Sequence, residues 1–500
     1  MFVSVLVLLA CSREFDEKTD VVRQDTGLDD TAADSDTDVV DADGDGSPDD
    51  EDCDDADPDV FPGADERCNG KDDDCDGSTE DEGDADADTL LDCEDYCPVY
   101  AAPGAAGDGR PTDPVGAVQD AIDIAASSSC YEVRAFAGTF EESVDFGGWP
   151  VNVESLSGPS ETILQGDGTQ SVVSFISGED EYARLFGFTV TGGGGSTGAG
   201  IVIQASSPTV EGNTIASNAT TELPHVGGGI STYDGSPLIL DNLIEENDAG
   251  YGGPENGSDG GAIRVRGGAP WIEGNLLLNN TAGDGGAIWL AYSDAMILHN
   301  VIAENVADDV PDEGEEEKDG QGGGINVQVS GPDGPYILNN LVVDNTASWY
   351  GGGIVTYEDN PAYGEATIAN NTILFNRVTQ TEYGAGICQW RRTTPLITNN
   401  IVAWNEGWGV TSEDGIDATF LYNLGFGNDL GSFDGVTGTG SLEIDPKFVL
   451  VTNDGDWTND DLTLKSTSPA RDAGNPEESY NDADGSRNDL GAFGGPNGSW

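Results

Sequence analysis

The chain has 500 residues, and 95 acidic against 18 basic side chains give it a formal net charge of −77. A charge of this sign and size excludes nucleic-acid backbones as partners and disfavours anionic membranes. The 71 glycines predict many tight turns and few helices, so the expected class is all-β.

Residues 1–11 form a short apolar run that ends in Leu8-Leu9-Ala10-Cys11. The run is too short to span a bilayer, which needs about 20 residues. It resembles the lipobox signal of bacterial lipoproteins, and the resemblance implies that Cys11 is lipidated on export. A plain apolar tail is the alternative. We therefore expect an exported protein whose only membrane contact is a lipid anchor, at the outer membrane or surface of a Gram-negative bacterium.

Residues 12–40 are acidic and lack an apolar period, which predicts a disordered tether. In residues 41–97 the carboxylates alternate as they do in calcium loops, where oxygens surround a hard cation. The sequence therefore predicts Ca2+ as a cofactor, and a purely solvated acidic linker is the alternative. One loop would use Asp41, Asp43, Asp45, Ser47, Asp49 and Asp52, and the other Asp84, Asp86, Asp88, Asp92 and Asp95.

The stretches Asp52–Pro58, Pro62–Cys68 and Asp72–Gly77 resemble the MopE-related metal-binding motif. That resemblance implies a metal but leaves its identity open, copper included. Disulfides would stabilise this coreless segment in an oxidising compartment, whereas a zinc site is the alternative. The spacing leaves the pairing open among six candidates, Cys53, Cys68, Cys75, Cys93, Cys97 and Cys130. Another cysteine, Cys388, is expected to be a buried core residue.

Residues 98–112 are rich in proline, glycine and alanine and are expected to be a linker. Asp113-Pro114 then has the form of a helix start, and apolar residues follow at helical spacing as far as Ala125. The sequence therefore predicts one short helix, which would cover one end of a domain spanning residues 113–440.

Within residues 113–440, two kinds of unit alternate about every 30 residues. No single repeat can bury its own apolar face, so the copies must stack strand on strand about 4.8 Å apart, with their asparagines in a hydrogen-bonded ladder. The expected architecture is a right-handed parallel β-helix, and an antiparallel propeller is the alternative. The strand-like units contain Asn213, Asn242, Asn275, Asn300, Asn340, Asn371, Asn400 and Asn423, and the glycine-rich units begin at Gly198, Gly227, Gly260, Gly285, Gly322, Gly351, Gly384 and Gly407.

The repeats and their flanks resemble the pectin-lyase-like β-helix superfamily. The resemblance implies a β-helix closed by an irregular segment, residues 441–500. It implies no particular activity, because this fold carries lyases, hydrolases, adhesins and inert stalks alike. The flanking stretches that carry it are Ala117–Ile122, Val133–Glu142, Leu185–Val190, Asp445–Val449, Ser468–Gly474 and Asp489–Phe493.

Insertions gather at one corner of the repeat, between the asparagine unit and the glycine-rich unit. In a solenoid they would stack as lips along one side. Aromatic side chains at this corner suit the C–H faces of sugars or a partner protein, so the sequence predicts a ligand groove. Packing of the loops themselves is the alternative. The insertions are residues 219–226, 248–259, 306–321 and 377–383, and the aromatic residues are Tyr251, Trp349, Tyr350, Tyr383 and Trp408.

The motifs of polygalacturonase-type hydrolases are absent, and His225 and His299 are the only histidines. Arg264 and Arg266 share one strand face and could supply a lyase base, although a pair of solvated arginines is the plainer interpretation. No catalytic residue is predicted. The predicted function is a monomeric surface protein for adhesion, or for binding an extracellular glycan or surface protein, without catalysis. A polysaccharide lyase or glycoside hydrolase is the alternative.

Overall fold

The protein's structure is a computed structural model. It divides into two compact units, residues 1–96 and 97–500, and all the helices and strands named below lie in the second unit. The residues that it describes are 47–48, 52–54, 60–62, 75, 97–128, 130–250, 258–308, 320–330, 334–358, 366–380, 384–391, 393–412, 419–452 and 454–498.

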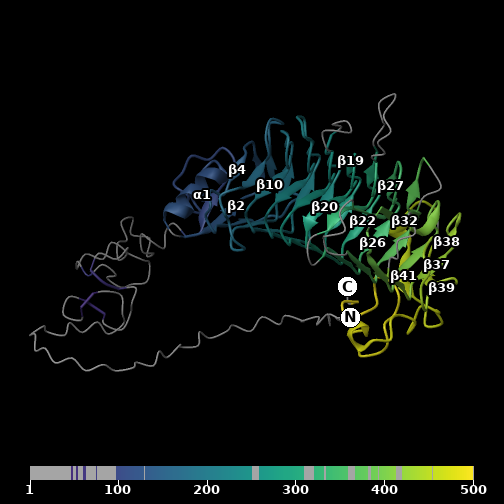
Figure 1. The fold of residues 1–500 in the computed structure, drawn as a ribbon. Helices are drawn as coiled ribbons and strands as arrows, with labels where there is room; N and C mark the ends of the chain where they lie inside the picture. The colour runs from purple at the N-terminus through teal and green to yellow at the C-terminus, as the bar shows by residue number, and fades with distance from the viewer. Residues whose placement is uncertain are drawn as a thin grey trace, which may run out of the picture. The chain divides into compact units, whose positions relative to one another are not determined.

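Within these residues, three long parallel sheets run side by side along one axis (Figure 1). The first sheet has the order β1 (Val99–Ala101), β2 (Glu132–Ala135), β5 (Asn152–Ser155), β8 (Arg184–Phe186), β11 (Thr209–Glu211), β14 (Leu238–Leu240), β17 (Trp271–Glu273), β21 (Met296–Leu298), β25 (Tyr336–Leu338), β29 (Thr367–Ala369), β33 (Leu396–Thr398) and β36 (Thr419–Leu421).

The second sheet has the order β3 (Gly138–Phe140), β6 (Thr162–Gln165), β9 (Thr189–Thr191), β12 (Thr214–Ala216), β15 (Leu243–Glu245), β18 (Leu276–Leu278), β22 (Val301–Ala303), β26 (Leu341–Val343), β30 (Thr372–Leu374), β34 (Ile401–Ala403), β37 (Leu424–Phe426) and β39 (Leu442–Glu443). The third sheet has the order β38 (Gly431–Asp434), β35 (Trp408–Ser412), β32 (Gly384–Arg391), β28 (Ile354–Glu358), β24 (Ile325–Ser330), β20 (Ile288–Ser293), β16 (Ile263–Arg266), β13 (Ile230–Tyr233), β10 (Ile201–Gln204), β7 (Val173–Phe175) and β4 (Val144–Asp145).

From β2 to β38, each coil contributes one strand to each long sheet. A short parallel sheet joins β19 (Thr281–Ala282), β23 (Val306–Ala307), β27 (Thr346–Ala347) and β31 (Arg377–Val378), and an antiparallel pair joins β40 (Phe448–Leu450) and β41 (Asp461–Leu464). Inward-facing isoleucine and valine side chains such as Ile230, Ile263 and Ile288 stack in one buried core. The predicted parallel β-helix is therefore confirmed, and the propeller is excluded.

The predicted asparagine ladder lies at the corner between the first and second sheets. Each asparagine from Asn213 to Asn400 donates its Nδ2–H to the Oδ1 of the next, at 2.9 to 3.2 Å. The same Oδ1 also accepts the backbone N–H of the preceding asparagine, as between Asn275 and Asn242 at 3.0 Å. The ladder side chains are buried. The prediction of hydrogen-bonded stacking is confirmed.

A second ladder, which the sequence analysis missed, runs parallel to the first and five residues later in each coil. Its amides join in the same way, as Asn247 does to Asn280 and Asn280 to Asn305, both at 3.0 Å. The two ladders flank the strands of the second sheet from β12 to β37. The second ladder consists of Asn218, Asn247, Asn280, Asn305, Asn345, Asn376, Asn405 and Asn428.

Two details at the start of the β-helix correct the sequence prediction. Residues 99–101, expected in a linker, form β1 and pair with β2. The short helix α1 (Val118–Ser127) is present, but it begins at Val118 rather than beside Asp113. Its first amides are capped by the Glu142 carboxylate, which accepts from the backbone N–H groups of Val118 at 2.7 Å and Gln119 at 3.1 Å. Because this cap comes from a later segment, the local pattern around Asp113 gave the wrong start.

The segment after β39 turns back over the outer face of the second sheet. Its Phe448, Leu462 and Leu490 pack on outward apolar residues such as Leu374 and Ile401. Asn339 fixes it further by donating Nδ2–H to the carbonyl of Ala492 at 2.8 Å. The segment also contains the 3-10 helices η2 (Trp457–Asn459) and η3 (Glu478–Tyr480). Among the described residues, no helix is long and apolar enough to cross a membrane.

Replacing Asn275 by alanine is expected to lower the free energy of unfolding by about 3 kcal/mol, because the change removes the acceptor of Asn242 and leaves the Ile239 carbonyl without its donor. Urea unfolding followed by circular dichroism measures the loss. Gln165→Ala removes an exposed amide from β6 and is the matched control. Equal stability of the two variants would contradict a structural role for the ladder.

Candidate functional site

The outer face of the third sheet gathers arginine and aromatic side chains. Along each strand the residues alternate, so Ile230 and Thr232 face the core while Ser231 and Tyr233 face outward. Parallel pairing then brings equivalent outward positions together, with Arg264 between Ser231 and Trp289. We call this surface the arginine–aromatic face; it consists of Tyr233, Arg264, Arg266, Trp289, Tyr357, Trp390 and Arg391.

Each arginine of this face lies over a ring. The Arg264 guanidinium carbon is 5.1 Å from the centre of the Trp289 ring, and that of Arg266 is 5.8 Å from the centre of Tyr233. The Arg391 carbon lies 4.6 Å from Tyr357 and 4.7 Å from Trp390. Such contacts hold the guanidinium planes in place.

Arg264 is largely buried and forms an ion pair with Asp259, its Nε lying 3.5 Å from Oδ2. Burial raises the pKa of the Asp259 carboxyl, and the charge of Arg264 opposes that rise. Burial likewise lowers the pKa of Arg264, against the pull of Asp259. The expectation that Arg264 and Arg266 share a face is confirmed, but only Arg266 is exposed to solvent.

A pocket of about 240 Å³ opens on this face between β10, β13 and β16. Val202, Tyr233 and Arg264 line it, together with Pro224 from the insertion 219–226. This insertion therefore borders the third sheet, as a lip would. Within the part of the chain that the structure describes, Ser231 Oγ has no hydrogen-bond partner, and Arg264 Nε makes the ion-pair contact with Asp259. The pocket thus combines apolar walls with a polar side chain and a cationic one.

The aromatic residues predicted for a groove behave differently. Tyr350 is 1% exposed and stacks on Trp390 of β32 with ring centres 4.3 Å apart, so it packs against a neighbouring coil and presents no face to a ligand. Trp349 is half-buried beside it, and Trp408 is half-buried against Gly431. Tyr251 and Tyr383 lie outside the described residues. The ring positions that the sequence analysis missed are one and three residues after the repeated isoleucine, as in Trp289 and Tyr357, and strand alternation could have found them.

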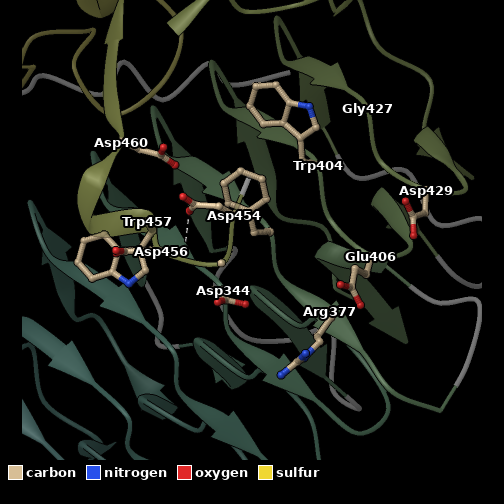
Figure 2. Close-up of a pocket in the computed structure, with 12 residues that line it drawn as sticks. Asp344, Arg377, Trp404, Glu406, Gly427, Asp429, Asp454, Asp456, Trp457 and Asp460 are labelled. Atoms are coloured by element: carbon tan, nitrogen blue, oxygen red, sulfur yellow. Dashed lines mark hydrogen bonds between the residues drawn. The ribbon is translucent and has the colours of Figure 1, made fainter. Parts of the chain in front are cut away.

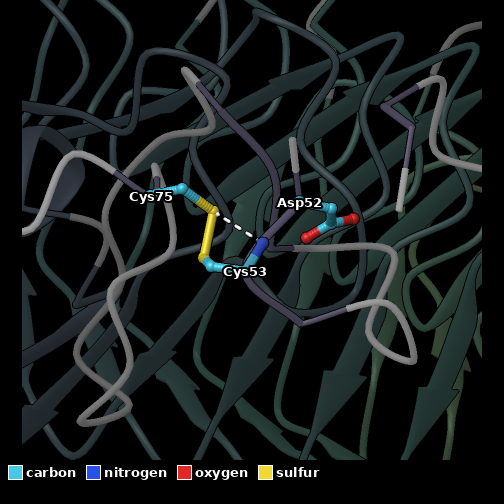
Figure 3. Close-up of side chains that lie close together, drawn as sticks. All are labelled: Asp52, Cys53 and Cys75. Atoms are coloured by element: carbon cyan, nitrogen blue, oxygen red, sulfur yellow. Dashed lines mark hydrogen bonds between the residues drawn. A yellow bond between two sulfur atoms is a disulfide. The ribbon is translucent and has the colours of Figure 1, made fainter. Parts of the chain in front are cut away.

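The predicted metal segment is described only in part. Cys53 and Cys75 form a disulfide, and the Asp52 carboxylate lies close to both sulfur atoms (Figure 3). Disulfide sulfurs are not thiolates, so this pair cannot bind a soft metal as cysteinate. Asp52 offers an oxygen ligand, which suits a hard cation. A second disulfide, Cys97–Cys130, lies within the β-helix unit.

Of the remaining residues predicted for residues 1–97, only Ser47 lies in the described part of the chain, and the others lie outside it. They are the lipidation candidate Cys11, the disulfide candidates Cys68 and Cys93, and the calcium candidates Asp41, Asp43, Asp45, Asp49, Asp84, Asp86, Asp88, Asp92 and Asp95. Cys388 is buried, as expected.

Two family models match the chain. Residues 199–402 match the model of the right handed beta helix region. The chain is a right-handed parallel β-helix protein. Residues 52–81 of this β-helix protein match the model described as "Putative metal-binding motif", which agrees with the predicted resemblance. No curated protein matches the sequence.

Solved structures similar to the β-helix include pectate lyase Pel9A, which is 15% identical, with 79% of this chain and 95% of that chain covered at a TM-score of 0.48. The A-module of the mannuronan C-5 epimerase AlgE4 from Azotobacter vinelandii is 12% identical, with coverage of 68% and 97% and a TM-score of 0.31. The surface protein and adhesin PfbA of Streptococcus pneumoniae is 13% identical, with coverage of 68% and 98% and a TM-score of 0.22.

Replacing Arg264 by alanine is expected to lower the free energy of unfolding by about 3 kcal/mol at neutral pH, because Asp259 loses its partner while largely buried. Burial raises the pKa of the Asp259 carboxyl in the folded protein above its ordinary value, so the folded protein favours the protonated form. The charged form therefore costs stability, and this cost appears as the pH rises through the folded pKa. The loss in the free energy of unfolding of Arg264→Ala should therefore become smaller as the pH falls.

Urea unfolding at neutral and mildly acidic pH measures this change. The double variant Arg264→Ala with Asp259→Asn has no buried charge at this position. Its loss in the free energy of unfolding relative to wild type should therefore be smaller than that of Arg264→Ala and almost independent of pH. A deficit for Arg264→Ala that is the same at every pH would contradict the assigned ion pair.

Proposed function

We propose that this β-helix protein binds an extracellular glycan on the arginine–aromatic face and acts as a non-catalytic surface protein. The observation that carries the proposal is the contact between arginines and rings on this face, in one group on β13, β16 and β20 and in a second group on β28 and β32. Rings such as Tyr233 contact the C–H faces of sugars, and guanidinium groups such as Arg266 match carboxylates with two parallel hydrogen bonds. A glycan that contains uronic acids fits both groups.

The negative charge of the chain favours this face over the rest of the surface as the place where an acidic glycan binds. With a net charge of −77, most of the surface repels a polyanion. Arg266 is exposed, and among the described residues it forms no ion pair, so its charge is available to an acidic sugar. Arg264, balanced by Asp259, serves to hold Trp289 and to shape the pocket wall.

The proposal includes the export of the protein, its lipid attachment through Cys11 and its function as a monomer at the surface of a Gram-negative bacterium. In this arrangement residues 12–40 form the tether and residues 41–97 form a base that Ca2+ stiffens. A disulfide at Cys53–Cys75 and a carboxylate at Asp52 support an oxidised segment that uses oxygen ligands. A surface protein could occupy the same face as a glycan.

A polysaccharide lyase is the second candidate, and one observation favours it. A lyase needs a base whose pKa is below the ordinary range of arginine, and burial lowers the pKa of Arg264, which lines the pocket on this face. Incubating the protein with each glycan that it binds, and measuring unsaturated products, separates this candidate from simple binding.

Tyr233→Ala and Arg266→Gln are each expected to weaken glycan binding by about tenfold, the scale of one lost stacking or charged contact. A glycan array identifies the ligand, and calorimetry then compares the variants. Tyr182→Ala and Arg134→Gln are matched controls, because Tyr182 is exposed two residues before β8 of the first sheet and Arg134 lies on β2 of the same sheet. The proposal fails if the two site variants bind the glycan as well as the controls do.

Chelation of Ca2+ by EDTA is expected to speed proteolysis within residues 41–97, because the repelling carboxylates lose their counter-ion. Limited proteolysis with mass spectrometry measures the cleavage rate, and restoring Ca2+, but not Mg2+, should return it to the starting value. Cleavage within residues 97–500 is the internal control and should not change. An unchanged rate in residues 41–97 would contradict the calcium proposal.

A further inference from the structure

A larger cavity, of about 370 Å³, lies on the outer side of the second sheet (Figure 2). One wall comes from equivalent corner positions of successive coils, and the opposite wall comes from residues 454–460 of the C-terminal segment. The cavity is therefore separate from the arginine–aromatic face. Its lining residues are Asp344, Phe375, Arg377, Trp404, Glu406, Gly427, Asp429, Asp454, Gly455, Asp456, Trp457 and Asp460.

Aromatic rings form the apolar part of this cavity and are held by packing. Trp404 stacks on Phe375 with centres 5.8 Å apart and receives Phe426 edge-on at 5.8 Å. On the opposite wall, Trp457 donates its Nε1–H to Glu304 Oε1 at 2.8 Å. Both indoles are thus fixed before any ligand arrives, which lowers the entropy lost on binding.

The polar part of the cavity is strongly negative. Six carboxylates face one guanidinium, that of Arg377, and this group donates its Nε–H to Thr346 Oγ1 at 2.8 Å. Burial is the largest cause of the raised pKa of Asp344; Arg377 opposes the rise, and the charges of Glu304 and Glu406 add to it. The negative charge in the cavity therefore exceeds what its own cation balances.

We propose that this cavity binds an organic cation, a primary ammonium group carried on a frame with apolar C–H surface. The ammonium group would meet the carboxylates of the coil corners and the loop, and the C–H surface would lie against Trp404 and Trp457. A bare metal ion would make no use of the rings, and a neutral sugar would leave the excess negative charge unbalanced. Amino sugars and polyamines share this chemistry. The proposal is independent of the glycan-binding proposal, because the two surfaces share no residue.

Calorimetry on the full chain tests this with three probes: glucosamine oligomers, the matched N-acetylglucosamine oligomers, and spermidine. We expect glucosamine oligomers or spermidine to bind and the neutral N-acetylated oligomers to bind at least about tenfold more weakly. Preference for glucosamine oligomers identifies an amino sugar, and preference for spermidine identifies a polyamine. Equal binding of the charged and neutral oligomers would overturn the proposal.

Two sets of variants locate the binding. Trp457→Ala removes a ring, and the double variant Asp344→Asn with Glu406→Gln removes two charges with little change of shape; Asp344 has φ 54, a conformation that asparagine also adopts readily. Each should weaken binding of the cation by about tenfold. The double variant Asp434→Asn with Glu443→Gln removes two exposed charges outside the cavity and should bind as wild type does. An equal loss in both double variants would mean non-specific attraction to an acidic protein and would also overturn the proposal.

Discussion

Stacking of the coils in register is the constraint on which the rest of the structure depends. Two buried rows of asparagine amides enforce it, because Asn213 and Asn218 each bond to the equivalent residue of the next coil at both backbone and side chain. A slip of one residue would break both rows and turn every side chain to the opposite face of its sheet. The same register aligns outward residues, so Arg264 lies beside Trp289 because Ile263 pairs with Ile288.

Much of the fold could be predicted from sequence because the stacked positions repeat in it. The asparagine series that begins at Asn213 and the glycine-rich units are both visible at a nearly constant spacing. The second series was equally regular, but it occurs at the start of insertions that vary in length, which hid it. The helix start could not be predicted locally, because the cap at Glu142 lies 24 residues beyond Val118.

The site was harder to predict for two physical reasons. Corner aromatics such as Tyr350 pack against neighbouring coils, whereas a strand aromatic such as Tyr233 is exposed on the outer face, and composition alone does not separate the two. The cavity near Trp457 had no sequence signal at all. It joins Asp344 to a loop more than a hundred residues away, and the contact depends on how the C-terminal segment packs over apolar corner and strand residues.

The ladders also tolerate great variation in the chain between their rungs. Successive asparagines of the first ladder are separated by as few as 23 residues and as many as 40, yet the amide contacts between them stay within the same short range of lengths. Loop length and coil stacking are thus uncoupled. A lineage could therefore lengthen or shorten one loop without changing the core. Duplicating the segment between two successive ladder asparagines would add one coil and lengthen the β-helix by about 4.8 Å.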